Sequence, residues 1–214
     1  EIGVRLVGSE MCIRDRYTYN GNYGSNKVKF GAYYGGSSKR SMKNLDLVNK
    51  RKNAWGTGLI FNHEIDSIQN VTVAAGFTRE ISENGNNTSL FRNAYGLGLA
   101  YNFVHTTYGV DLERQVTKNQ GDKRIKNEVR AVIRQGLNDD WNVYAMYAYK
   151  TDKHSHNTDR TRQFMVGTEY YVFNQGSLKV KPFLEWQATR TKYENSAVDR
   201  SRDFKTVIGL RAYW

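Results

Sequence analysis

The last eleven residues, 204–214, alternate between an apolar and a small or polar side chain, and this period of two constrains the fold more than any other feature. Successive side chains of a strand point to opposite faces. One face therefore carries Phe204, Thr206, Ile208, Leu210, Ala212 and Trp214, and the other carries Lys205, Val207, Gly209, Arg211 and Tyr213. The first face suits hydrocarbon and the second suits water. The segment predicts a β-strand with one lipid-facing side.

The same alternation recurs back through the chain, with turn residues between the segments. Each short alternating segment is a weak signal individually, but several of them together are typical of a transmembrane β-barrel. Several segments exceed the usual strand of about 5–6 residues and match a tilted membrane-spanning strand. The pattern predicts eleven strands, near residues 17–20, 27–34, 54–61, 71–78, 91–103, 108–113, 125–135, 141–149, 163–172, 178–188 and 204–214.

Composition excludes the main alternatives to a strand-rich fold. The net charge is +11, and glycine occurs 19 times. Aromatic residues, however, make up 13% of the chain, and this content is too high for a disordered basic tail. No run approaches the roughly 18–20 apolar residues of a membrane-spanning helix. Pro182 is the single proline, as expected where most backbone N–H groups join strand ladders.

The first sixteen residues are treated separately from the rest. The run Val7–Arg16 resembles a translated sequencing-adapter remnant, so residues 1–16 are interpreted as a non-native segment and residues 17–214 as a single barrel domain. The alternative is a native strand at residues 1–7. Cys12, the only cysteine, lies in this segment, so the domain has no disulfide framework.

Connection lengths and strand phase predict the topology. The connections near Ile65, Val104, Asp139 and Gln175 are tight, whereas those near residues 45, 85, 120, 157 and 196 are mostly longer and more polar. Up-and-down outer-membrane barrels have short periplasmic turns and longer extracellular loops. If Trp214 ends at the periplasm, the first strand is missing or replaced. We therefore expect an all-β, antiparallel barrel of about twelve strands, with fourteen as the alternative.

Aromatic side chains gather near the ends of the outward faces, as membrane-interface belts require. The predicted belt residues are Phe61, Tyr101, Phe103, Trp141, Tyr170, Trp186 and Trp214. A soluble β-sandwich, with the same residues in its core, is the alternative. Belts favour the outer membrane of a Gram-negative bacterium as the location.

The inward face combines small residues with basic ones. Small side chains on a lumen face leave space, which favours a conduit. The predicted anion pathway consists of Lys29, Arg92, Lys126, Arg130, Arg134, Lys150, Lys179, Lys181, Lys205 and Arg211. Cations in a narrow channel concentrate anions, so anionic solutes should pass preferentially. The inward acids Asp111, Glu113, Glu128, Glu169 and Glu185 leave open a second interpretation, a mixed-charge wall of weak selectivity.

The size, the Tyr, Gly and Lys/Arg content, the twelve-strand phase and the terminal segment Gly209–Trp214 together resemble the oligogalacturonate-specific (KdgM-type) porins. The resemblance covers residues 17–214 and implies a monomeric pore for acidic oligosaccharides, with basic residues along its lumen. This chain departs from the family in its inward acids and in ending on Trp where Phe is usual. Small monomeric porins of the OmpG type, with mixed-charge lumens, are the nearest alternative.

Other functions have weaker support in the sequence. Asp152, His154 and His156 share one predicted extracellular loop, where a solvated surface is the simpler interpretation, so neither an enzyme nor a metal or cofactor site is expected. A barrel enzyme or adhesin remains an alternative. Nucleic acid is not an expected partner, because the cations are spread over many strands and interleaved with acids. The expected partners are the lipid bilayer with its lipopolysaccharide, anionic small solutes, and the barrel-assembly machinery through the C-terminal strand.

Overall fold

The fold was analysed in a computed structural model that describes residues 15–36, 50–83, 89–119, 121–155, 157–175, 178–194 and 200–213. Within these ranges the secondary structure consists of twelve strands and no helix: β1 Asp15–Tyr23, β2 Asn26–Gly35, β3 Lys50–Glu64, β4 Gln69–Glu83, β5 Ser89–Phe103, β6 Thr106–Asn119, β7 Asp122–Gly136, β8 Trp141–His154, β9 Asn157–Tyr170, β10 Phe173–Gln175, β11 Leu178–Lys192 and β12 Arg200–Tyr213. In that part of the chain no helix is long and apolar enough to cross a membrane.

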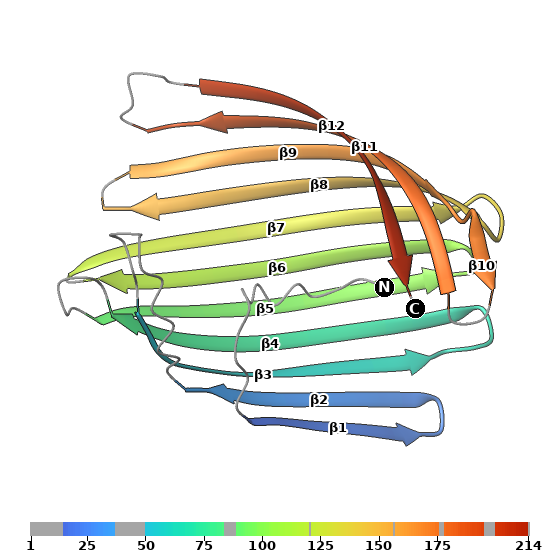
Figure 1. The fold of residues 1–214 in the computed structure, drawn as a ribbon, viewed down its shortest axis with the longest axis horizontal. Helices are drawn as coiled ribbons and strands as arrows, with labels where there is room; N and C mark the ends of the chain where they lie inside the picture. The colour runs from blue at the N-terminus through green and yellow to red at the C-terminus, as the bar shows by residue number, and fades with distance from the viewer. Residues whose placement is uncertain are drawn as a thin grey trace.

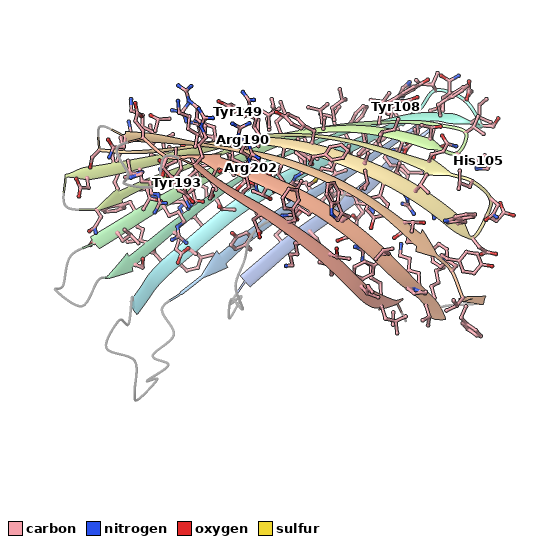
Figure 2. The ribbon with its side chains drawn as sticks, turned by 90° about the horizontal axis from the view of Figure 1, so that it is seen from above. His105, Tyr108, Tyr149, Arg190, Tyr193 and Arg202 are labelled. Carbon is pink, nitrogen blue, oxygen red and sulfur yellow. The ribbon has the colours of Figure 1, made fainter. Side chains whose placement is uncertain are left out.

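The strands form one antiparallel sheet in which each long strand pairs with the next one along the chain (Figure 1). The short strand β10 pairs only with the start of β11, so β9 and β11 are direct neighbours. The predicted all-β, up-and-down order of eleven spanning strands is confirmed. Figure 2 shows that the sheet is strongly curved, with Tyr108 and Tyr149 projecting from its convex side.

The sheet is not closed into a barrel in the described part of the chain. Among the described residues β1 pairs only with β2 and β12 pairs only with β11, so the sheet has two open edges. The reason is directional: with eleven long strands in up-and-down order, β1 and β12 run toward the same end (Figure 1). An antiparallel barrel closes only with an even number of strands.

Two connections of the sheet are shorter than the sequence predicts. Tight turns join the strands at one end, as at Val104–His105 between β5 and β6. At the other end, however, β6 ends at Asn119 and β7 begins at Asp122, and β8 ends at His154 while β9 begins at Asn157. The predicted extracellular loop is therefore wrong at Asp152 and His154, which continue β8 beyond its apolar part, while His156 lies outside the described residues.

Side chains alternate between the two faces as predicted. The apolar residues assigned outward lie on the convex face and are uncovered, including Leu97 (49% exposed), Leu99 (51%) and Leu112 (44%). Since the described strands form a single sheet, no second sheet packs on these residues, and the β-sandwich alternative is wrong. The buried apolar side chains of the described core are small ones on the concave face: Ala54, Ala74, Ala100 and Ala148.

Candidate pore-lining face

The strand register places all of the predicted pathway cations on the concave face. One row of directly opposed residues runs from Asp111 through Arg130 to Ala148 and Gln163. Arg130 and Ala148 thus share the face that carries Arg134 and Lys150, which lie at even-numbered spacings along the same strands. The cations are unevenly distributed along this face, and most of them contact acids.

Glu169 is the centre of the largest ion cluster. Its side chain is 4% exposed and lies on β9, between β8 and β11. Its carboxylate accepts hydrogen bonds from Arg134 on β7 at 2.6 Å, Lys181 on β11 at 3.1 Å and Arg211 on β12 at 3.0 Å. Three predicted pathway cations therefore share one carboxylate, and none of them is an independent anion site.

A second carboxylate, Glu185, extends this cluster along β11. It accepts one hydrogen bond from Arg211 at 2.9 Å and another from the hydroxyl of Tyr144 at 2.7 Å. The Arg211 guanidinium also lies 4.2 Å from the centroid of the Phe183 ring, within the range of a cation–π contact. The cluster thus links five strands, β7, β8, β9, β11 and β12, at the turn end of the sheet.

A separate cluster surrounds Glu128 on β7. Arg130 contacts Glu128 at 2.6 Å and Asp111 at 3.9 Å, and Lys150 reaches the other oxygen of Glu128 at 3.3 Å. Glu113 lies directly opposite Glu128 on β6. This middle part of the concave face therefore carries both signs of charge within a few ångströms.

A third cluster lies near the tip of the β7–β8 ladder. Arg124 donates two hydrogen bonds to Asp152, at 2.7 and 2.6 Å, and Lys126 approaches the same carboxylate at 3.5 Å. These bonds from Arg124 lower the pKa of Asp152 below its usual value, although partial burial acts in the opposite direction. The geometry is the bidentate one that fixes a guanidinium and a carboxylate in a plane.

We expect this ion pair to make stability depend on pH. Because folding lowers the pKa of Asp152, the stabilisation is complete above the unfolded value of about 3.9 and is lost as the pH falls through the lower folded value. The side chains are 24% and 52% exposed, so the contribution is below about 1 kcal/mol. Urea unfolding at a series of pH values should show Asp152→Asn destabilised at neutral pH and equal to wild type in strong acid. A difference that stays constant with pH would contradict this.

The remaining pathway cations are less engaged. Arg92 lies 3.5 Å from Glu80. Within the described part of the chain Lys29, Lys179 and Lys205 have no ion-pair partner. These three lysines, on β2, β11 and β12, are the pathway residues whose charge is not neutralised locally.

The two faces of the sheet carry very different net charges. On the concave face the basic side chains nearly balance the acidic ones, because Glu64, Glu80, Asp122, Asp152, Asp159 and Asp203 join the five acids already identified. On the convex face the charged residues of the strands whose side chains are described are all basic: Arg79, Arg114, Lys118, Lys123, Lys153, Arg160, Arg162, Arg190, Lys192, Arg200 and Arg202. Among the side chains that the structure describes, the excess of positive charge on the strands therefore lies mainly on the convex face.

This convex basic set was not predicted, although the phase of the strands contains the signal for it. Arg202 is in phase with Phe204, Arg190 with Trp186 and Arg162 with Phe164. Extending the alternation past each aromatic residue would have assigned these arginines to the outward face. The same extension places Arg124, also missed, on the concave face with Lys126.

Aromatic rings fill part of the space that the small inward residues were predicted to leave open, at three glycines. Tyr144 lies over its cross-strand partner Gly167, and Phe183 lies over Gly209 in the same way. Tyr33 covers Gly56 on β3. Glycine at these positions admits a ring flat against the sheet, so these glycines hold rings in place and do not widen a channel.

Replacing a glycine that lies under a ring should therefore cost more stability than replacing a glycine that no ring covers. A Cβ at position 167 would lie 2.5–2.7 Å from ring atoms of Tyr144, whereas at Gly96 it would meet nothing within 4 Å. We expect Gly167→Ala to displace the ring, break the Tyr144–Glu185 hydrogen bond and cost about 1–2 kcal/mol. Gly96→Ala should be neutral or stabilising by up to about 1 kcal/mol. Urea unfolding compares the two variants, and equal effects would contradict the ring-packing role.

The predicted belt aromatics lie on the convex face wherever they are described. Tyr101 stacks on Tyr108 at 6.4 Å between centroids and donates its hydroxyl to Gln69 at 2.7 Å. Trp141 donates its indole N–H to Thr168 at 2.7 Å, and Trp186 stacks on a neighbouring strand's Phe204 at 6.1 Å. The exposed belt members also include Phe61, Phe103 and Tyr170, while Trp214 lies outside the described residues.

The residues weighed as a catalytic or metal site do not form one in the described structure. Both oxygens of Asp152 are engaged by Arg124, His154 lies at the end of β8, and His156 is outside the described residues. Within the described ranges no group of three or more His, Cys, Asp or Glu side chains could hold a metal ion.

Comparisons with known proteins identify the fold. No protein-family model and no curated protein sequence matches the chain. Among solved structures, in-vitro folded OmpT, an outer membrane protein of Vibrio cholerae, is similar with a TM-score of 0.62 and 14% identity, over 93% of this chain and 64% of that one. An anion-selective porin from Comamonas acidovorans is similar with a TM-score of 0.65 and 14% identity, over 92% and 58% of the two chains.

Outer-membrane expressed OmpT of Vibrio cholerae gives a TM-score of 0.58 at 16% identity, over 93% of this chain and 64% of that one. At these identities the similarity establishes the fold, which is that of outer-membrane β-barrel proteins of Gram-negative bacteria. The predicted outer-membrane location agrees with it. The chain spans less than two thirds of the length of these proteins. The finer resemblance to the oligogalacturonate-specific porins remains a prediction.

Proposed function

We propose that this chain forms the wall of an outer-membrane porin, a channel for the diffusion of small solutes. The observation that carries the proposal is the opposition of the two faces of one curved sheet. The convex face exposes Leu97, Leu99 and Leu112, whereas the concave face carries polar and charged side chains such as Arg130 and Glu128. Such a wall is stable between hydrocarbon and a water-filled lumen.

Within this function we propose a modest preference for anions, with acidic oligosaccharides as the solute class. The lysines without ion-pair partners among the described residues, Lys29, Lys179 and Lys205, support this preference, because an unpaired cation attracts anions more strongly than a neutralised one. One structural neighbour is itself described as an anion-selective porin. The other pathway cations contribute less, since their charge is shared with acids.

A mixed-charge porin of weak selectivity is the second candidate. The near balance of charges on the concave face favours it, above all the Glu169 and Glu128 clusters. The two candidates differ in one measurable property, the sign and size of the ion selectivity. Catalysis forms no part of either proposal.

Planar-bilayer recording of the complete reconstituted chain tests both candidates. Under a salt gradient, we expect a reversal potential on the anion-selective side for wild type, and a shift toward zero for Lys29→Gln/Lys179→Gln/Lys205→Gln. An absence of conductance would overturn the porin proposal. Conductance without anion preference would overturn the selectivity proposal alone and favour the mixed-charge candidate.

The proposed partners follow from the same architecture. We expect a monomer, embedded in the bilayer and its lipopolysaccharide, whose C-terminal strand binds the barrel-assembly machinery. The open outer edge of β12, with Ile208 80% exposed and Leu210 65% exposed, is the feature most relevant to such binding. Cross-linking from substituted positions on β12 tests this expectation.

A further inference from the structure

Two rows of basic side chains cross the convex face at the end of the sheet opposite the tight turns. In the first row, Arg190 on β11 lies directly opposite Arg162 on β9 and Arg202 on β12. In the second row, Lys192 on β11 lies directly opposite Arg160 and Arg200 on the same two neighbours. We call these six residues the outer basic grid; Figure 2 labels Arg190 and Arg202.

The grid encloses a recess on the surface. Tyr149 on β8 and five grid residues, namely Arg160, Arg162, Arg190, Lys192 and Arg200, line a cavity of about 290 Å³. All six members of the grid are exposed. Directly opposed side chains on adjacent strands lie about 5 Å apart at their Cβ atoms, so the guanidinium groups can converge on one bound group.

Little in the described part of the chain offsets the positive charge of the first row, Arg162, Arg190 and Arg202. In the described part of the chain no carboxylate lies within ion-pair distance of Arg162, Arg190 or Arg202. Glu194, two residues after Lys192, instead accepts the backbone N–H of Thr158 at 2.5 Å. Like charges placed directly opposite each other destabilise a sheet. The arrangement therefore favours an external anion.

The position of the grid relative to the membrane limits which anion this is. On each strand the grid lies between an outward aromatic residue and the rim of the sheet; these aromatic residues are Phe164 on β9, Trp186 on β11 and Phe204 on β12. Outward aromatic rings lie at the level of lipid headgroups, so the grid lies at or just beyond that level, on the outside of the sheet. At the other end the convex face carries uncharged residues such as Tyr170 and Pro182. A solute in the lumen faces the opposite side of the sheet.

We propose that the outer basic grid binds the phosphate groups of a phosphorylated glycolipid, such as lipopolysaccharide, in the outer leaflet. Arginine forks bind phosphate oxygens bidentately, and several arginines from three strands surround one recess. Bound phosphates neutralise the opposed cations and fix β9, β11 and β12 against the leaflet. The grid also sets the orientation, since the end that carries it faces the leaflet with phosphorylated glycolipid.

Native mass spectrometry of the complete chain in non-ionic detergent, with bis-phosphorylated lipid A as the probe, tests the proposal. Arg162→Gln/Arg190→Gln/Arg202→Gln should weaken lipid A binding at least about tenfold, because a single hydrogen bond to a charged group is commonly worth a decade of affinity. The matched control is Lys29→Gln/Lys179→Gln/Lys205→Gln, which removes the same charge from the concave face. It should bind lipid A as wild type does, and the grid variant should keep the wild-type ion selectivity.

Heat-modifiable migration on a detergent gel shows whether each variant is folded. If the Gln variant does not fold, Arg162→Lys/Arg190→Lys/Arg202→Lys retains the charge but loses the planar fork, and its affinity should fall severalfold. Equal binding by wild type and the folded variants would overturn the proposal. The proposal would also be overturned if dephosphorylated lipid A bound as tightly as bis-phosphorylated lipid A. It would likewise be overturned if inorganic phosphate occupied the recess while lipid A did not bind.

Discussion

Glu169→Gln is expected to destabilise the folded chain by about 3 kcal/mol. The substitution preserves the shape of the side chain but removes the charge that neutralises Arg134, Lys181 and Arg211. Removing one partner of a buried ion pair commonly costs about 3–5 kcal/mol, because the other charge remains buried. We expect the lower end of this range, since Lys181 is 8% exposed but Arg134 and Arg211 are about one third exposed.

Urea unfolding in lipid vesicles measures this loss, and Asp203→Asn is the matched control. Asp203 is another acid of the concave face, but it is exposed and has no ion-pair partner in the described part of the chain. Its substitution changes the net charge by the same amount and should cost less than about 0.5 kcal/mol. If both substitutions had equal effects, the contacts of Glu169 would not be the cause.

The sequence predicts the strands and their faces because the membrane imposes both. Wherever a strand contacts hydrocarbon, every second residue is apolar, and residues such as Leu97 and Leu99 reveal the phase directly. The pattern weakens beyond the bilayer, where water solvates both faces. Residues 151–159 are polar on both sides of the chain for this reason. Their sequence therefore predicts a loop, although the β8–β9 ladder continues through His154.

The ion clusters could not be predicted from alternation alone. The phase places Glu169 on the concave face but does not specify which cations reach it. Arg134 and Arg211 lie 35 and 42 residues away and come from β7 and β12, so their convergence depends on the tilt and register of five consecutive strands in the sheet. The same limit applies to the glycines: that Tyr144 covers Gly167 follows from the pairing of β8 with β9.

The distribution of charge changes the physical meaning of the composition. The chain is strongly basic, yet the described concave face is close to neutral and the excess of positive charge on the described strands lies on the convex face at one rim. The proposed ion selectivity and the proposed lipid binding therefore rest on different residues. Lys29, Lys179 and Lys205 serve the first proposal and the outer basic grid serves the second, so each can be altered without the other.

The central premise of both proposals is that the convex face is solvated by hydrocarbon, and Leu97→Arg tests it. Leu97 lies at the middle of β5, faces outward and is 49% exposed. An arginine near the bilayer midplane of a barrel costs about 2–4 kcal/mol. We expect a loss of this size when unfolding is measured in lipid vesicles.

The matched substitution is Gln163→Arg, which adds the same side chain on the concave face, opposite Ala148 and Thr189. In a water-filled lumen the new guanidinium stays hydrated, so the expected change is below about 0.5 kcal/mol. Both variants place one extra positive charge on the middle of a strand. The difference between their losses of unfolding free energy therefore reports the difference in solvent between the two faces. If Gln163→Arg were as costly as Leu97→Arg, the concave face would not be wet, and neither a diffusion channel nor an outward lipid site would follow from the alternation.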